Sequence, residues 1–260
     1  HRRPAAGITA TQADAARRAM AGEPRVIGVD GCRAGWIAAT PAGLAVGPTL
    51  AGLLDTLGAD PARSVVAVDM PIGLPVCGSR DCDRVAREQL GGPRRASVFD
   101  TPTRAAVHGA ASQAEATRIN RAHGGAGVSA RAYNLFDKLR EVDRLLHDDP
   151  RWRASMVEAH PELSFAAWNG GEGTRLQPMP HPKTAALGAF DRLTLVLARH
   201  DRRLLEAVRA AHPRKALADD DIADALACLF TAERVAAGRH QVLPGRPACD
   251  ADGLPMRICI

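Results

Sequence analysis

The chain has few aromatic residues and no long apolar run. Aromatic residues make up 3% of its 260 residues, so leucine, valine, isoleucine and alanine must fill the core of a chain that is 46% apolar. No run approaches the roughly 18 apolar residues of a transmembrane helix, and the first four residues lack the apolar stretch of a secretory signal. These absences predict a cytoplasmic protein with no membrane partner.

Six cysteines are present, but their spacing is not that of a zinc site. Four residues separate the only close pair, Cys77 and Cys82, and no second pair or His-x-x-x-His follows. We therefore expect free thiols in a reducing cytoplasm, rather than a structural zinc ion or disulfides.

The net charge of +5 is weak evidence for a nucleic-acid surface. Residues 1–24 carry +2 of it, which leaves about +3 for the rest of the chain. Only three of the 34 basic residues are lysines, most simply a bias of genome composition. A basic leader weakens the argument for a basic binding face, so charge alone decides little.

Two short apolar runs each end on an aspartate, and a third acidic element lies near the C-terminus. Asp30 follows Val-Ile-Gly-Val, and Asp69 follows Val-Val-Ala-Val; Asp221 and Asp224 belong to the third element. Short apolar runs bounded by glycine or proline are typical of strands buried on both faces. A carboxylate at the end of such a strand needs a positive partner. Three such placements indicate a pocket for a divalent metal.

The order of elements predicts an α/β fold with a mixed five-stranded sheet. Three strands form an antiparallel meander, a helical crossover makes the fourth strand parallel to an earlier one, and a fifth strand follows. We expect a flexible leader over 1–24, one domain over 25–240 with a helical insertion at about 75–150, and an irregular tail over 241–260. The expected strands are 25–30, 36–40, 44–46, 65–69 and 155–158, and the expected helices include 50–57, 81–90, 129–146, 160–168 and 219–238.

This order, with aspartates on the first and fourth strands and Asp-x-x-Asp on the last helix, resembles the RNase H-like superfamily. The last motif is similar to the closing motif of Holliday-junction resolvases. The chain is more closely similar to domain-of-unknown-function family 429, a predicted nuclease family of this superfamily, from about Val26 to Gly238. The matching blocks are 28–36, 69–75, Ser97-Val98-Phe99 with Pro102 and Arg104, 158–165, Lys183-Thr184 and 224–226.

The resemblance implies a nuclease that holds two Mg²⁺ or Mn²⁺ ions about 3.5–4 Å apart. Hard cations prefer oxygen ligands, so three or four carboxylates suffice. Asp30 would bridge the two ions, and Asp69 and Asp224 would each complete one site. Asp221 lies on the same helical face as Asp224. Glu158 closes the strand expected beside Asp69 and is a candidate fourth ligand.

The same resemblance suggests which residues contact the substrate, expected to be DNA or RNA. Arg33, Arg104 and Lys183 are candidates to contact phosphate, and His160 is a candidate to orient water. Together with Asp30, Asp69, Asp224 and Glu158, His160 completes the expected catalytic set.

Several of these residues also have an ordinary structural explanation. Asp221 suits a helix start, where capping and the helix dipole favour acids. Asp30 and Asp69 suit turns or loops that contain glycine. Glu158 suits an ion pair with an arginine, and His160 before proline suits a structural role. Arg104 suits a solvated loop.

Two other functions stay open. Asp30-Gly31-Cys32-Arg33-Ala34-Gly35 loosely resembles the first phosphate loop of actin/hexokinase-like phosphotransferases, although those proteins need a duplicated domain. A non-catalytic binding module could keep the same fold, and so few aromatic residues offer few platforms for base stacking. A homodimer is also left open.

Overall fold

The computed structural model describes residues 22–171 and 175–260. Almost all of the leader expected over 1–24 therefore lies outside the described residues, as do residues 172–174.

The central sheet has five strands in the order β3-β2-β1-β4-β5. The first three pair antiparallel, and β4 and β5 continue the sheet in parallel with β1. This confirms the predicted mixed sheet. The strands are β1 (Arg25–Cys32), β2 (Gly35–Thr40), β3 (Gly43–Gly47), β4 (Ser64–Val68) and β5 (Met156–Glu158).

Alternate residues of the central strands face two separate apolar clusters. In β1, Ile27 and Val29 belong to the cluster formed with helices α2 (Leu50–Thr56) and α7 (Phe136–Asp148). The residues between them point to the other face of the sheet. Examples are Val26 in β1 and Ala67 in β4, which face helices α8 (Pro161–Asn169) and α11 (Asp219–Ala236). Both faces are covered, which explains the nearly continuous apolar sequence of these strands.

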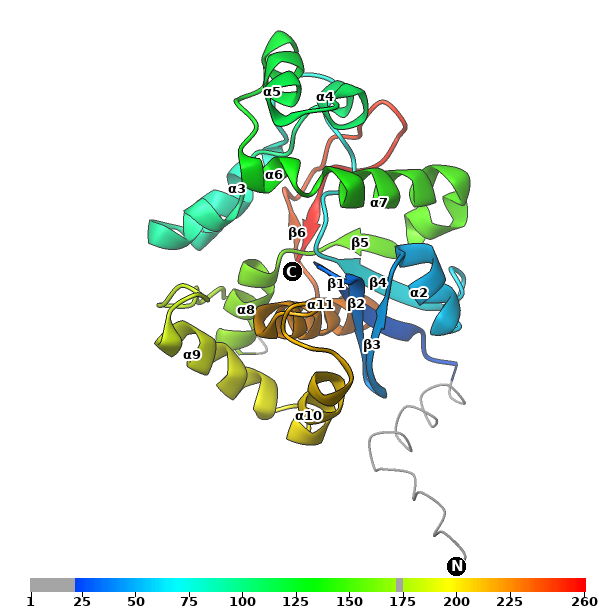
Figure 1. The fold of residues 1–260 in the computed structure, drawn as a ribbon, viewed down its shortest axis with the longest axis vertical. Coiled ribbons are helices and arrows are strands. Elements are labelled where there is room, and N and C mark those ends of the chain that lie inside the picture. The colour runs from blue at the N-terminus through cyan, green and yellow to red at the C-terminus, as the bar shows by residue number, and fades with distance from the viewer. Residues whose placement is uncertain (1–21, 172–174) are drawn as a thin grey trace, which may run out of the picture.

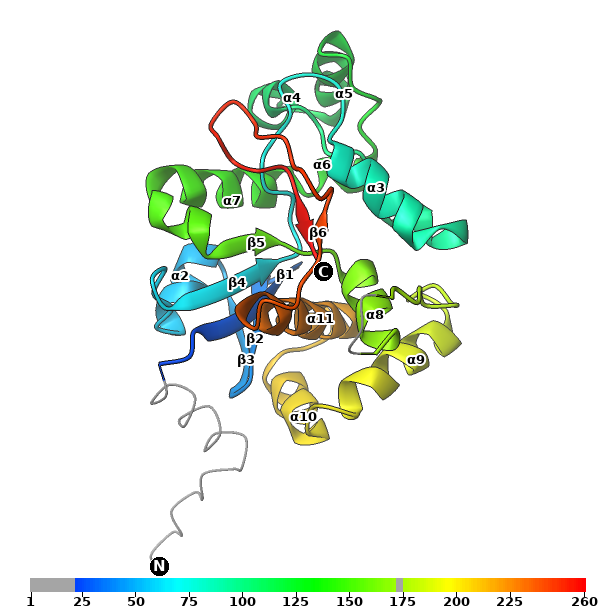
Figure 2. The same ribbon diagram turned by 180° about the vertical axis from the view of Figure 1, so that it is seen from behind.

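Most of the segment between β4 and β5 is helical. Figures 1 and 2 show it gathered on one side of the sheet. It contains α3 (Asp81–Leu90), η1 (Gly92–Ser97), α4 (Arg104–Gly109), α5 (Gln113–Ala122), α6 (Ala130–Tyr133), α7 and η2 (Pro150–Ala154). The single helix predicted over 129–146 is two helices, because a tight turn interrupts it where the Leu135 amide bonds to the Ala132 carbonyl.

The chain after β5 forms a second helical layer and then returns across the sheet. Helices α9 (Ala186–Leu197) and α10 (Arg202–Ala211) lie beyond α8, on the opposite side from α4 and α5 (Figures 1 and 2). The tail 241–260 is not wholly irregular as expected, because β6 (Val242–Leu243) and β7 (Ile258–Cys259) pair antiparallel. In the described part of the chain, no helix is long and apolar enough to cross a bilayer.

Candidate active site

A close approach of α11 to β1 brings the C-terminal acidic element to the first strand. At Gly28, an added Cβ would lie 1.9 Å from the Leu229 backbone nitrogen and 2.4 Å from the Ala225 carbonyl oxygen. Only glycine permits this contact, so the helix lies directly on the strand. Asp224 precedes Ala225, and Asp30 lies two residues after Gly28 on the same face of β1.

Asp30 and Asp69 lie at one level of two neighbouring parallel strands, as predicted. Val29 pairs with Val68, and the Asp69 amide donates to the Val29 carbonyl at 2.8 Å. Asp69 thus extends the ladder by one residue. Both aspartates lie on the face of the sheet that packs against α11. Asp30 Oδ1 also accepts a hydrogen bond from the Gly31 amide at 2.7 Å, so the turn expected for Asp30 accounts for one of its oxygens.

The three carboxylates form a group of like charges, in which Asp30 and Asp224 are buried and Asp69 is half-buried. Burial raises the pKa of Asp30 well above its usual value, and the charges of Asp69 and Asp224 raise it further. Burial and the charge of Asp224 raise the pKa of Asp69 to about 7. Burial raises the pKa of Asp224 to about 6, although Lys183 opposes the shift. Burial is the largest cause of each shift, and the negative charges of neighbouring carboxylates add to it.

Lys183 provides the positive charge at this group. Its ammonium lies 2.6 Å from Asp224 Oδ2 and 3.0 Å from Asp220 Oδ2. Burial works against the charged lysine, but the two aspartates outweigh it, and the pKa of Lys183 is raised. Lys183 therefore belongs to the carboxylate group itself, rather than to an open phosphate-binding surface.

Glu158 is held by an arginine that the sequence analysis missed. Arg80 is buried and donates from Nη1 and Nη2 to the two oxygens of Glu158, at 2.7 and 2.8 Å. The Ile72 amide donates to the same carboxylate at 2.8 Å. Arg80 also pairs with buried Asp83. Both oxygens of Glu158 are engaged, as its structural alternative predicts, so Glu158 is less available to a metal ion than the three aspartates.

Asp221 and His160 line the same cavity as the three carboxylates, but their surroundings differ. Asp221 Oδ2 accepts a hydrogen bond from the Ala218 amide at 2.9 Å, which is the helix-capping role expected as its alternative. Its charge still raises the pKa of Asp30. His160 immediately precedes α8, and burial lowers its pKa. Its Nδ1 atom is buried and has no hydrogen-bond partner among the described residues.

The remaining two predicted residues lie away from this group. Arg33 is exposed in the turn between β1 and β2. Arg104 begins α4 and pairs with Asp143 at 2.7 Å, Asp250 at 2.8 Å and Asp252 at 2.9 Å. Arg104 thereby joins the helical segment to the C-terminal tail, which is a structural role rather than the phosphate contact expected.

One cavity of about 430 Å³ joins seven of the nine predicted site residues. Such a volume is within the range of small-molecule sites. Arg33 and Arg104 do not line it. The predicted residues that do are Asp30, Asp69, Glu158, His160, Lys183, Asp221 and Asp224.

The cavity also contains polar residues that the sequence did not single out. Arg80 and Asp83 are three residues apart at the start of a helix, where charged residues are usually solvated. Both are buried, and Arg80 pairs with Glu158, which lies 78 residues further along the chain. Asp220 could have been found, because it belongs to the acidic run that starts α11.

The carboxylates converge, but they are not arranged as a finished coordination sphere. In the ranges that the structure describes, no three histidine, cysteine, aspartate or glutamate side chains are placed to hold a metal ion as they stand. The oxygen-rich, charged donor set has the chemistry that Mg²⁺ and Mn²⁺ prefer. A bound ion would have to compete with Lys183 for Asp224.

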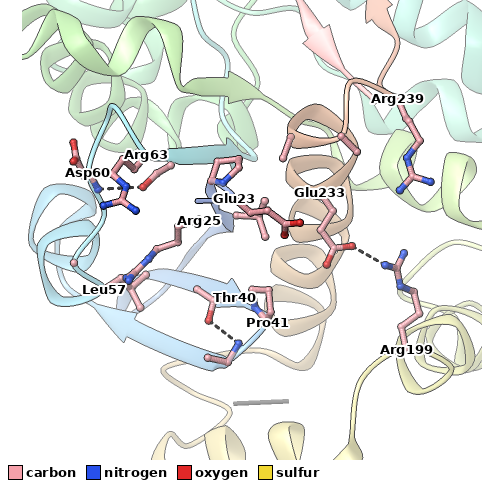
Figure 3. A pocket seen from close by; sticks show the side chains of 17 residues that line it. Glu23, Arg25, Thr40, Pro41, Leu57, Asp60, Arg63, Arg199, Glu233 and Arg239 are labelled. Carbon is pink, nitrogen blue, oxygen red and sulfur yellow. Dashed lines mark hydrogen bonds and ion pairs between the residues drawn. The ribbon is translucent and has the colours of Figure 1, made fainter. Parts of the chain in front are cut away.

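A second, larger cavity of about 1020 Å³ lies at the other ends of the same strands. It is lined by the first residues of β1 and β4 and the last of α11. Figure 3 shows the side chains of Arg199 and Glu233 pointing toward one another. They form an ion pair of 2.7 Å. Four arginines and three acidic residues line this cavity, whereas acids dominate the group around Asp30.

Comparison with known proteins gives one finding. The model of a family described as protein of unknown function (DUF429) matches residues 28–248. No curated protein and no solved structure matches the chain.

Proposed function

The chain belongs to the DUF429 family, and from its converging carboxylates we propose that it is a divalent-metal-dependent phosphodiesterase of the RNase H-like type, acting on nucleic acid. The observation that supports this proposal is the meeting of Asp30, Asp69 and Asp224 from three distant segments, with raised pKa values. We propose these three as ligands of Mg²⁺ or Mn²⁺, with Asp221 at the edge. Bound ions would activate water and stabilise the leaving oxygen of a phosphodiester.

Other residues of the cavity would support hydrolysis without holding metal. Lys183 neutralises Asp224 in the metal-free chain, and its ammonium would be available to a substrate phosphate once Asp224 binds a cation. The lowered pKa of His160 keeps its ring neutral, so Nδ1 can accept a hydrogen bond from water. Arg80 fixes Glu158 and the loop at Ile72 that forms one wall.

The six cysteines are free thiols, which supports a reducing compartment. We therefore propose that the protein acts in the cytoplasm. The proposed substrate is DNA or RNA.

One observation favours a second candidate, a non-catalytic binding module. Lys183 already neutralises Asp224 and Asp220, and the carboxylates do not form a ready metal site within the described residues. In this case the lysine would replace the metal permanently. The phosphotransferase alternative gains no support, because the five-stranded sheet occurs once in the described part of the chain.

Metal binding and cleavage together test the proposal. We would titrate Mn²⁺ into the protein by calorimetry, and assay labelled single-stranded, duplex and branched DNA and RNA with Mn²⁺. The wild type should bind Mn²⁺ and cleave at least one substrate. Asp30→Asn should lower cleavage more than about 100-fold, beyond the usual loss from outer-shell changes. Asp137→Asn is the matched control, because its side chain is 95% exposed on α7.

The outcomes separate the two candidates. Mn²⁺ binding with cleavage that is lost in Asp30→Asn supports the phosphodiesterase. Cleavage that is unchanged in Asp30→Asn contradicts it. A wild type that does not bind Mn²⁺ favours the binding module.

A further inference from the structure

The carboxylates of the candidate site are buried in the wall of a narrow cavity. Asp30 and Asp224 are only 7% and 4% exposed, and the cavity that they line has a volume of about 430 Å³. A sphere of that volume is about 9 Å across, whereas the major groove of a DNA duplex alone is about 12 Å wide. An intact duplex is therefore too wide to enter. A phosphate that reaches these carboxylates must arrive on a strand that is locally unpaired.

Phe99 gives this cavity one aromatic surface. It is half-buried, lines the cavity, and packs against the apolar cluster that contains residues of α7. Among the described residues that line the cavity, it is the one phenylalanine, tyrosine or tryptophan. Six of the nine aromatic residues of the chain are instead buried in the core, namely Trp36, Phe136, Trp152, Phe165, Trp168 and Phe230. One accessible aromatic ring is a platform for one base.

The segment that carries Phe99 is held on both sides of the ring by one residue of α3. Arg87 donates from Nε to the Val98 carbonyl at 3.0 Å. It also donates from Nη2 to Asp100 Oδ1 at 2.6 Å. Both neighbours of Phe99 along the chain therefore have a fixed partner, and the backbone at Phe99 has little freedom to lose when a ligand binds. Such preorganisation lowers the entropic cost of binding.

Arg131 is a cation of the same cavity that is available to a ligand. Three arginines and lysines line the cavity, and two of them are already paired. Arg80 pairs with Glu158 at 2.7 Å. Lys183 pairs with Asp224 at 2.6 Å. Arg131 of α6 is exposed, and its guanidinium has no ion pair within the described residues. A guanidinium binds phosphate oxygens through paired donors, so Arg131 suits the backbone of an entering strand.

We propose that this cavity takes one unpaired nucleotide of a DNA or RNA strand, with its base stacked on Phe99 and its phosphate beside Arg131. The choice of an unpaired strand rests on the phosphodiesterase function proposed above, and it adds the form of the substrate. The width of the cavity rejects the duplex, so a single strand, a flap or a flipped-out nucleotide can enter. Phe99 determines specificity, because a base offers its face to the ring only when it has left the duplex.

Fluorescence anisotropy tests this selection separately from cleavage. A short labelled single strand would be compared with the same strand annealed to its full complement, both as DNA and as RNA. Ca²⁺, which also prefers oxygen ligands, replaces Mn²⁺ so that binding is measured apart from Mn²⁺-dependent cleavage. The wild type should bind the single strand at least about fivefold more tightly than the duplex, the lower end of what one stacked base contributes. Electrostatic attraction alone favours the duplex, which has the higher charge density.

Substitutions of Phe99 test the stacking platform. Phe99→Leu should weaken binding of the single strand about fivefold or more, because leucine fills the position without an aromatic face. Binding of the duplex should not change. Phe99→Tyr keeps the ring and should bind the single strand like the wild type. Phe190→Leu is the matched control, because Phe190 is 66% exposed on α9 and does not line the cavity. Circular dichroism would check that every variant is folded.

A substitution of Arg131 tests the phosphate contact. Arg131→Ala should weaken binding of the single strand several-fold and reduce the slope of log K against log salt by about 0.7, as expected for one phosphate contact with a single strand. Arg118→Ala, at an exposed arginine of α5, is the matched control and should change the slope less.

Failure of this selection and failure of the proposed function give different results. Binding of the duplex as tightly as the single strand, binding of neither, or equal effects of Phe99→Leu and Phe190→Leu overturns the selection of an unpaired nucleotide. Each of these can occur while Mn²⁺-dependent cleavage is lost in Asp30→Asn and the phosphodiesterase stands. Selective binding that depends on Phe99, without cleavage of any substrate in Mn²⁺, supports the selection and contradicts the phosphodiesterase.

Discussion

Two groups of acidic residues share one cavity, yet their charges are compensated in different ways. Asp83 and Glu158 both pair with Arg80, which also donates to backbone carbonyls of the neighbouring loop. Burial acts to raise the pKa of both carboxyl groups. Arg80 outweighs burial at Asp83, whose pKa is lowered, but not at Glu158, whose pKa is raised. Asp30, Asp69 and Asp224 have raised pKa values.

The difference lies in the cation that each group has. A guanidinium offers five donors in a fixed plane and can satisfy two carboxylates at once. Lys183 is a point charge, and it is shared with Asp220. The first group is therefore a structural element, whereas the second retains negative charge that an added cation can neutralise.

The largest expected effect is the loss of the structural cation. Arg80→Met should lower the free energy of unfolding by about 3–5 kcal/mol, because it leaves two buried carboxylates without their partner. Urea denaturation measures this. Arg84→Met is the control, since Arg84 is on the same helix with exposed partners and should change stability by less than about 1 kcal/mol. Equal effects of the two changes would remove the distinction between the groups.

Replacing an aspartate with asparagine should change the free energy of unfolding in opposite directions in the two groups. Asp83→Asn should destabilise the protein by about 1–3 kcal/mol, because buried Arg80 loses charge-assisted bonds. Asp30→Asn should stabilise the metal-free protein at pH 8 by on the order of 1 kcal/mol, because it removes a repulsive charge. Urea denaturation in EDTA compares them. Destabilisation by both variants would show that the group around Asp30 is already balanced.

The pH dependence of stability should reveal the unbalanced group. Folded Asp69 and Asp224, with pKa values of about 7 and 6, hold protons that the unfolded chain has already released. Their contribution to the free energy of unfolding of metal-free protein therefore falls as pH rises from about 4 to 7. His160 and His200 have lowered pKa values, so their contribution to the free energy of unfolding rises with pH instead.

The informative quantity is therefore the difference between the wild type and Asp69→Asn. Urea denaturation from pH 5 to 8 in EDTA should show the wild type losing more stability with rising pH than the variant. Mn²⁺ should remove this difference in slope, because metal binding displaces the protons. If the wild type and Asp69→Asn lose the same stability as pH rises in EDTA, the raised pKa values are contradicted.

The smallest effect is expected outside the cavity, at Arg33. If exposed Arg33 contacts one substrate phosphate, Arg33→Ala should weaken nucleic-acid binding several-fold and reduce the slope of log K against log salt by about 1. Fluorescence anisotropy in EDTA at several salt concentrations measures both. Arg118→Ala, at an exposed arginine of α5, is the control. The same slope change in both variants would show only a general effect of charge.

Much of the sheet was predictable, because local sequence patterns indicate where its strands begin and end and in which order they follow one another. The apolar runs before Asp30 and Asp69 are strands that pair in parallel, and the meander and crossover have the predicted order. The break at Leu135 and the pairing of β6 with β7 were missed. These depend on one backbone turn and on two-residue strands, which leave no periodic signal.

The candidate site was predictable only in part. Asp30, Asp69 and Asp224 could be found because each interrupts or follows an apolar pattern. Glu158 and Arg104 suited two roles each, and their partners decided between them. Nothing local distinguishes Arg80 from a solvated arginine.

By itself, the sequence determined which segments are buried strands and where acidic residues leave them, since alternation, length and glycine act over a few residues. Only the tertiary structure decided which charges are balanced. Arg80 reaches Glu158 across 78 positions, and Lys183 reaches Asp224 across 41. The pKa of a buried group depends on the few ångströms around it, and those neighbours are chosen by packing rather than by proximity along the chain.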